Sequence, residues 1–235
     1  MSEAPSDILA EHITDHRRDR MDAVLEHRVR TIAVVLENLY DPHNISAVLR
    51  SAEGLGIQDI HIVEAEHKFK FSRGVTKGCE RWLTLQRYPT ATECAQALKQ
   101  QGYRIAVSDH RPGTPRIEDL DPTVPRIFWL GAEHAGISDE ARGLADETFG
   151  IPMTGFTESF NVSVAAALTL YTARTRWEQA TGRSGDLSDD AREELRLSWL
   201  KRQLAGADHI LARHDVGSDR KSWRTRATNT HPPRG

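Results

Sequence analysis

The stretch that decides the fold runs from Ile127 to Arg176 and contains IFWLGAEHAGIS (127–138) and FGIPMTGFTESFNVSVAAALTLYTARTR (149–176). Two apolar runs in it, residues 127–130 and 148–151, each end at a loop that contains glycine or proline. A helical pattern follows each loop, so both runs are predicted to be buried parallel strands. Ligands of open α/β sheets bind outside the carboxyl ends of such strands, so the two loops mark the expected site.

The helix that follows the second loop consists almost entirely of small and apolar residues, with Val162, Val164 and Leu168 around three consecutive alanines. A helix that is apolar on nearly every face has to be buried on nearly every face. We therefore expect residues 161–171 to pack both on their own sheet and on a second subunit, which predicts a homodimer.

Outward from this stretch, strand and helix patterns alternate along the chain. Strands are expected at 31–36, 60–63, 82–88 and 103–108, and helices at 45–56 (capped by Asn44) and 90–101. This alternation predicts an α/β fold with a mainly parallel sheet flanked by helices. Charged helical patterns at 6–30 and 187–212 predict extensions at both ends, followed by a basic tail at 215–235. The expected division is an N-terminal extension (1–30), a catalytic domain (31–180) and a C-terminal extension (181–235).

The composition fits one substantial core and excludes several classes of protein. The 235 residues are 38% hydrophobic and 28% charged, with a net charge of −3, so any surface that binds nucleic acid has to be local. Neither a membrane span nor the pattern of a signal peptide is recognisable. The two cysteines, Cys79 and Cys94, suit a reducing compartment, and no spacing suggests a metal site. These features predict a cytoplasmic protein without a metal.

Three segments carry a family resemblance: NLYDPHNISAVLRSAEGLG (38–56), LGAEHAGIS (130–138) and IPMTGFTESFNVSVAAAL (151–168). In this order they resemble the three motifs of the SpoU (TrmH) branch of the SPOUT RNA methyltransferases, over roughly residues 31–176. Within that branch the sequence of these motifs is most similar to that of the tRNA guanosine-18 2′-O-methyltransferases. The resemblance implies S-adenosyl-L-methionine as methyl donor, tRNA as substrate, a homodimer and a deep trefoil knot in the C-terminal part of the catalytic domain. The residue patterns without the motifs fit an ordinary βαβ core with polar loops equally well.

No G-x-G-x-x-G fingerprint follows the first strand, so a dinucleotide site of the Rossmann type is not expected there. The resemblance implies instead which residues bind the donor. The late loops should bind it, and Gly131 and Gly155 would let the backbone approach a ligand closely. The expected donor-binding residues are Ser108, Leu130, Gly131, Ile151, Met153, Gly155, Ser159 and Phe160.

The resemblance also implies four catalytic residues, Asn44, Arg50, Glu133 and Asn161, and has Glu133 orient Asn44 or Arg50. Each also has an ordinary interpretation. Asn44 and Asn161 can begin helices, Arg50 can pair with Glu53 at i,i+3, and Glu133 can be a loop carboxylate near a helix capped by Ser138. A guanidinium stays protonated, so we expect Arg50 to bind a phosphate and stabilise charge as the 2′-hydroxyl loses its proton.

Substrate RNA is expected to contact basic residues of the N-terminal helix, the long loop at 64–79 and the end of the apolar helix: Arg17, Arg18, Arg20, Lys68, Arg73, Arg174 and Arg176. The ordinary interpretation of the N-terminal arginines is a solvated helix face. Two alternatives to the guanosine-18 activity stay open. One is methylation of ribosomal RNA or of a wobble nucleotide, and the other is a catalytically silent RNA-binding homodimer.

Overall fold

The computed structural model describes residues 4–65, 70–132 and 135–214. Within it the chain forms two compact units. One unit is Glu26–Leu187, and the other combines Met1–Leu25 with Ser188–Gly235, so the two terminal extensions share one unit.

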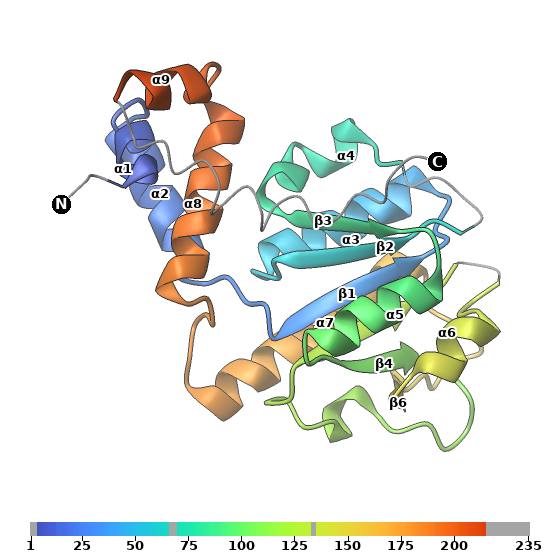
Figure 1. Ribbon diagram of the computed structural model, residues 1–235. Helices are drawn as coiled ribbons and strands as arrows, with labels where there is room; N and C mark the ends of the chain where they lie inside the picture. Colours follow the sequence, from blue (N-terminus) through green and yellow to red (C-terminus); the bar gives the residue numbers. More distant parts are fainter. Residues whose placement is uncertain (1–3, 66–69, 133–134, 215–235) are drawn as a thin grey trace. The chain divides into compact units, whose positions relative to one another are not determined.

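The larger unit is built on a six-stranded sheet with the order β3-β2-β1-β5-β4-β6 (Figure 1). Its strands are β1 (Ile32–Glu37), β2 (Asp59–Val63), β3 (Thr84–Tyr88), β4 (Arg104–Ser108), β5 (Arg126–Leu130) and β6 (Glu147–Phe149). All of the neighbouring strands pair in parallel. The prediction of an α/β fold with a parallel sheet is therefore confirmed, and the carboxyl ends of β4, β5 and β6 lie together at one edge.

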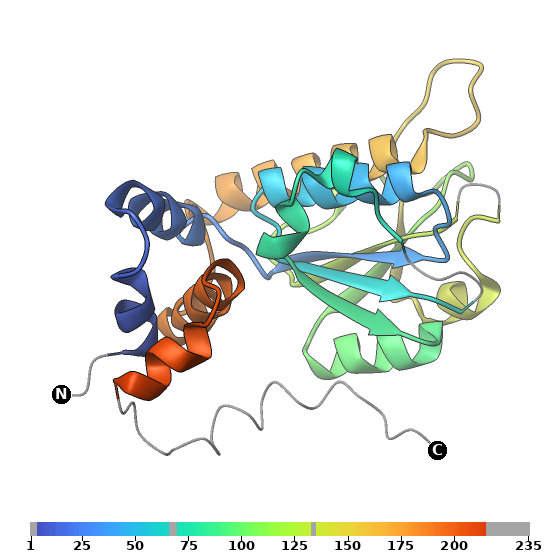
Figure 2. The same cartoon turned by 90° about the horizontal axis from the view of Figure 1, so that it is seen from above.

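Helices cover both faces of this sheet, as Figure 2 shows. The helices α3 (Pro42–Gly54) and α7 (Val162–Thr181) lie on one face, and α5 (Ala91–Gln100) and α6 (Asp139–Leu144) lie on the other. Successive side chains of β1 point to opposite faces of the sheet and pack in both layers. Val34 and Leu36 pack toward α3 and α7, and Ala33 and Val35 pack on the opposite side. Short helical turns complete the unit: α4 (Arg73–Thr76), η1 (Cys79–Trp82) and η2 (Ile117–Asp119).

The smaller unit consists of α1 (Pro5–Ala10), α2 (Asp15–Leu25), α8 (Asp189–Gln203) and α9 (Ala207–Arg213). Leu9, Trp199 and Leu200 form its buried centre. Arg196 of α8 ties it together by ion pairs of 2.7 Å to Asp7 and 3.1 Å to Asp22. The expectation of one helix over 187–212 is wrong. The helix ends at Gln203 and restarts at Ala207, because Gly206 adopts a left-handed φ of 82°.

The start of α3 also differs from the expectation. The helix begins at Pro42, and the Asp41 side chain caps it by accepting a hydrogen bond of 2.9 Å from the His43 amide. Proline at the first helical position with aspartate before it is a favourable helix start. Asn44 therefore lies within the first turn and does not cap the helix.

In the described part of the chain, no helix is both long enough and apolar enough to cross a membrane. Cys79 and Cys94 are buried and free.

Candidate active site

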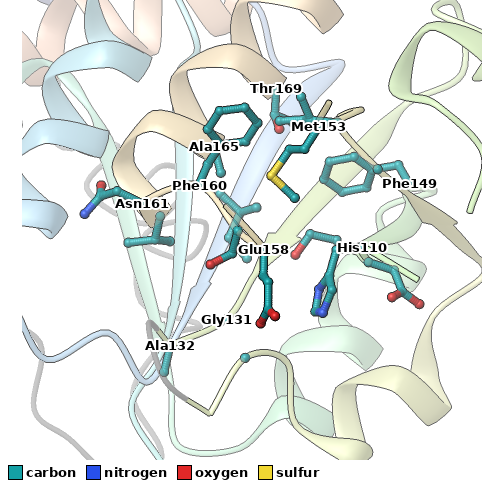
Figure 3. A pocket seen from close by; sticks show the side chains of 18 of the residues that line it. His110, Gly131, Ala132, Phe149, Met153, Glu158, Phe160, Asn161, Ala165 and Thr169 are labelled. Atoms are coloured by element: carbon teal, nitrogen blue, oxygen red, sulfur yellow. The ribbon is translucent and has the colours of Figure 1, made fainter. Parts of the chain in front are cut away.

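A cavity of about 480 Å³ opens at the carboxyl ends of β4, β5 and β6 (Figure 3). Ser108 ends β4, Leu130 ends β5 and Phe149 ends β6, and all three line the cavity. The first turns of α7 close one side through Val162, Ala165 and Thr169. The cavity therefore lies where the sequence analysis expects a ligand in a sheet of this kind.

Seven of the eight residues expected to bind the donor line this cavity: Ser108, Leu130, Gly131, Ile151, Met153, Ser159 and Phe160. The eighth, Gly155, is not among the lining residues. A Cβ atom added at Gly155 would meet no protein atom within 4 Å, so the fold itself does not require glycine there, and its role in donor binding stays a prediction.

Gly131 has a different physical reason from the expected one. A Cβ atom at this position would lie 2.0 Å from the carbonyl oxygen of Gly136. Ala132 and Gly136 exchange backbone hydrogen bonds of 3.1 and 2.9 Å, so the loop after β5 turns back over Gly131. Glycine is required here because the loop backbone already occupies the space of a side chain, and the expected close approach of a ligand stays a prediction.

The mouth of the cavity is polar. His110 and Glu158 are exposed there, and Asp109 is held beneath them by Arg111, whose Nε donates to Oδ2 at 2.7 Å. Arg142 from α6 lies 3.6 Å from the same carboxylate. The hydrogen bond from Arg111 is the main reason that the pKa of Asp109 lies below its usual range, so Asp109 stays ionised. Sequence reasoning missed this group, although Asp109 and His110 directly follow Ser108 at a strand end.

The interior of the cavity is apolar and aromatic. Phe149 is buried and packs edge-on against Phe128, with ring centroids 5.1 Å apart. In Figure 3 the side chains of Thr169, Met153 and Phe160 lie toward one end of the cavity, and those of Glu158 and His110 lie toward the other. The cavity therefore offers an apolar slot with a charged entrance, which suits a ligand with an aromatic part and a polar part.

Asn44 and Asn161, two of the residues expected to be catalytic, meet beside the cavity. Nδ2 of Asn161 donates a hydrogen bond of 3.1 Å to Oδ1 of Asn44, which joins α3 to the start of α7. The other end of the Asn161 amide caps α7, because Oδ1 accepts from the Ser163 amide at 2.9 Å. Asn161 lines the cavity as well, so one side chain connects the helix start, the neighbouring motif and the ligand space.

Arg50 is exposed on α3 and does not pair with Glu53. Glu53 instead accepts from Nη2 of Arg28 at 2.8 Å, and Arg28 is completely buried. A buried guanidinium needs a carboxylate far more than an exposed one does. Within the described ranges, Arg50 makes no hydrogen bond or ion pair.

The expected RNA contacts are dispersed. On α2, Arg17 donates to Gln203 at 2.9 Å, Arg18 pairs with Asp15 at 2.7 Å, and Arg20 is exposed. Glu133 and Lys68 lie outside the described residues, as does the side chain of Arg73.

The prediction that Arg174 contacts RNA is wrong. Only 6% of Arg174 is exposed, and its guanidinium lies 5.0 Å from the centre of the Trp177 ring. It donates to the backbone carbonyls of His27, Leu55 and Ser184. Its role is therefore to join three chain segments within the core. Arg176 is half-buried and donates to the Leu120 carbonyl at 3.2 Å.

Comparison with known proteins places these features in a family. The model of the SpoU rRNA Methylase family matches residues 31–171. A tRNA (guanosine(18)-2'-O)-methyltransferase of Borreliella burgdorferi is 33% identical over 205 residues, which cover 86% of this chain and 93% of that protein.

Two solved structures are similar as well. The A. aeolicus TrmH/SpoU tRNA modifying enzyme has a TM-score of 0.75 and 27% identity, and the match covers 81% of this chain and 98% of that one. The SpoU methyltransferase AviRb from Streptomyces viridochromogenes, solved in complex with the cofactor AdoMet, has a TM-score of 0.59 and 27% identity over 66% of this chain and 60% of its own. With its matched sequence, its parallel sheet and its cavity at the strand ends, the chain belongs to the SpoU rRNA methylase family.

Proposed function

We propose that this protein transfers a methyl group from AdoMet to the 2′-hydroxyl of guanosine 18 in tRNA. The observation that carries the proposal is the joining of Asn44 and Asn161 beside the cavity at the strand ends, with Arg50 on the same helix as Asn44. The similarity to the tRNA (guanosine(18)-2'-O)-methyltransferase of B. burgdorferi, which covers 93% of that relative, supports the choice of substrate.

The cavity fits AdoMet in size and in chemistry. Its volume of about 480 Å³ lies within the range of small-molecule sites. The apolar interior would hold the adenine, and the charged mouth around Asp109 and Arg142 suits the polar parts of the donor. When bound, AdoMet supplies an electrophilic methyl group on a sulfonium. The residues that would hold it are Ser108, Leu130, Ile151, Met153, Ser159 and Phe160.

Arg50 acts on the substrate in this proposal. Its guanidinium binds a phosphate beside the target ribose and stabilises the charge that develops as the 2′-hydroxyl loses its proton. Arginine remains protonated, so it does not remove that proton itself. Asn161 holds Asn44 and the donor cavity in a fixed relation, which orients the ribose toward the methyl group.

We also propose that α2 contributes to tRNA binding through Arg17, Arg18 and Arg20. The exposed ion pair of Arg18 with Asp15 contributes little free energy, so a phosphate can replace Asp15 as its partner. Contacts of Lys68 and Arg73 with tRNA stay predictions. The trefoil knot in the catalytic domain stays a prediction as well. A tRNA substrate implies a cytoplasmic protein.

A homodimer accounts for the exposed apolar side chains of α7. Val164, Leu168 and Tyr171 lie at helical spacing, follow Phe160, and like it are each at least 39% exposed. Such an exposed apolar stripe, on a helix whose opposite side packs in the core through Ala166 and Leu170, fits a subunit interface. Since Phe160 also lines the cavity, we propose that the interface borders the donor site. Sedimentation that shows a monomer at micromolar concentration, with activity retained, would contradict this.

The experiment that tests the function uses labelled AdoMet and two tRNA transcripts, one unmodified and one with 2′-deoxyguanosine at position 18. We expect the label to enter only the first transcript, at that nucleotide. Label in both transcripts would indicate another target, such as a wobble nucleotide. Label only in ribosomal RNA, or RNA binding without transfer, would support the alternatives of a ribosomal-RNA enzyme or a silent binding protein.

A further inference from the structure

Thr169 on α7 carries a buried hydroxyl group without a partner. The residue is 0% exposed and lines the cavity, and its Oγ1 makes no hydrogen bond with any group in the described part of the chain. Leaving a buried hydroxyl unpaired is unfavourable, so native structures seldom do so without a reason.

Two other helical hydroxyls in the described part of the chain bond the carbonyl four residues earlier, which is the usual partner inside a helix. Thr181 of the same helix donates to the Trp177 carbonyl at 2.8 Å, and Ser46 of α3 donates to the Pro42 carbonyl, in each case four residues earlier. Thr169 makes no such bond to Ala165. The residues that lie with it at its end of the cavity, Met153 and Phe160, offer no strong hydrogen-bonding group. The hydroxyl therefore has no partner among the described residues, and the cavity that Thr169 lines is the space from which a bound molecule would supply one.

A nucleobase has the chemistry that this end of the cavity requires. Its faces are apolar and aromatic, whereas its edge carries ring nitrogens and an amine that need hydrogen bonds. We infer that the Thr169 hydroxyl hydrogen-bonds the edge of the adenine ring of the methyl donor. This inference rests on the proposed function and adds to it a specificity-determining side chain outside the loops expected to bind the donor. A hydroxyl both donates and accepts, so either a ring nitrogen or the exocyclic amine can be its partner.

The test measures the binding of S-adenosylhomocysteine by calorimetry, which needs neither RNA nor turnover. Thr169→Val keeps the shape of the side chain and removes the hydroxyl, and we expect it to weaken binding about 3- to 10-fold. Thr169→Ser keeps a hydroxyl and should bind within about twofold of the wild type. Thr181→Val, on the same helix but with its own partner, is the matched control and should leave affinity unchanged.

The melting temperature of the ligand-free protein gives a second readout with opposite signs. Thr169→Val removes an unpaired buried hydroxyl and should raise the melting temperature, whereas Thr181→Val breaks a hydrogen bond and should lower it. A residue that only supports the fold would not combine a more stable free protein with weaker ligand binding.

Analogues that each lack one ring nitrogen or the exocyclic amine identify the contacted atom through double-mutant cycles. One analogue should bind the wild type more weakly than S-adenosylhomocysteine does. Thr169→Val should bind that analogue and S-adenosylhomocysteine equally well. Equal losses for both proteins with every analogue would overturn the inference, as would an unchanged affinity of Thr169→Val for S-adenosylhomocysteine. A wild type that binds no S-adenosylhomocysteine would instead overturn the proposed function itself.

Discussion

The two ends of the Asn161 amide have separate roles, and two substitutions distinguish them. Oδ1 caps α7 through the Ser163 amide at 2.9 Å, and Nδ2 reaches Asn44 at 3.1 Å. Asn161→Ala removes both interactions. Asn161→Ser keeps a good capping oxygen, but its side chain is too short to reach Asn44.

The expected magnitudes follow from these contacts. Loss of a helix cap costs about 1 kcal/mol. The bond to Asn44 is exposed and contributes roughly 0.5 kcal/mol, at the low end for a hydrogen bond. Asn161→Ala should therefore lower the free energy of unfolding by about 1.5 kcal/mol, and Asn161→Ser by about 0.5 kcal/mol. Methyl transfer should fall in both variants alike, by roughly 100-fold, because the Asn44 side is no longer held in register with the donor cavity.

Urea denaturation measures the first quantity, and single-turnover methylation of tRNA measures the second. Thr90→Ala is the matched control, because Thr90 caps α5 by accepting from the Glu93 amide at 3.1 Å. It should cost about 1 kcal/mol of stability without slowing transfer. If Asn161→Ser transfers methyl groups at the wild-type rate, Asn161 is only a helix cap and its proposed role in orienting the ribose is wrong.

Three further predictions follow from the packing. Gly131→Ala should lower the free energy of unfolding by about 3 kcal/mol in urea denaturation, because its Cβ would meet the Gly136 carbonyl, whereas Gly155→Ala should change it by less than about 0.5 kcal/mol. Arg174→Gln should destabilise the fold, because it breaks the bonds that this arginine makes to three chain segments, yet it should leave the salt dependence of tRNA binding unchanged. Burial raises the pKa of Asp59 to about 6 and lowers the pKa of His61 to about 4. Acidification from pH 7 to 4 therefore stabilises the fold through Asp59, which binds its proton more readily when folded, and destabilises it through His61, which binds its proton less readily. Each effect reaches about 3 kcal/mol at the acidic end. Relative to the wild type, Asp59→Asn should therefore lose stability on acidification and His61→Gln should gain it, as measured by denaturation across this range.

The sheet and the general location of the cavity could be predicted from the sequence. Apolar runs that end at glycine or proline identify strands, and a parallel sheet then brings the strand ends to one edge. That is why seven of the eight expected donor-binding residues line the cavity. The first turn of α3 was also predictable in principle, since Asp41-Pro42 is a helix-start signal that the match at Asn44 obscured.

The partners of the charged residues could not be predicted, because they depend on segments far apart in the sequence. Glu53 has Arg50 within helical reach, yet it pairs with Arg28, which lies 25 residues away in the chain and is completely buried. Arg174 has the same side chain as Arg50, but it is enclosed by Leu55 and Ser184. Which arginine is free for a phosphate is decided by which arginine the core encloses.

The first half of α7 shows why periodicity fails where nearly every residue is apolar. Its faces have different surroundings: Ala166 and Leu170 pack in the core, Leu168 and Tyr171 are exposed, and Thr169 lines the cavity. Hydrophobic spacing assigns faces only when polar residues mark the face that is not buried. Thr169 is the one polar side chain between 164 and 170, and a hydroxyl retained in such a run has to have a partner. In a helical segment with so few polar residues, the one polar side chain between 164 and 170 thus indicates the face toward the cavity, which the apolar pattern cannot.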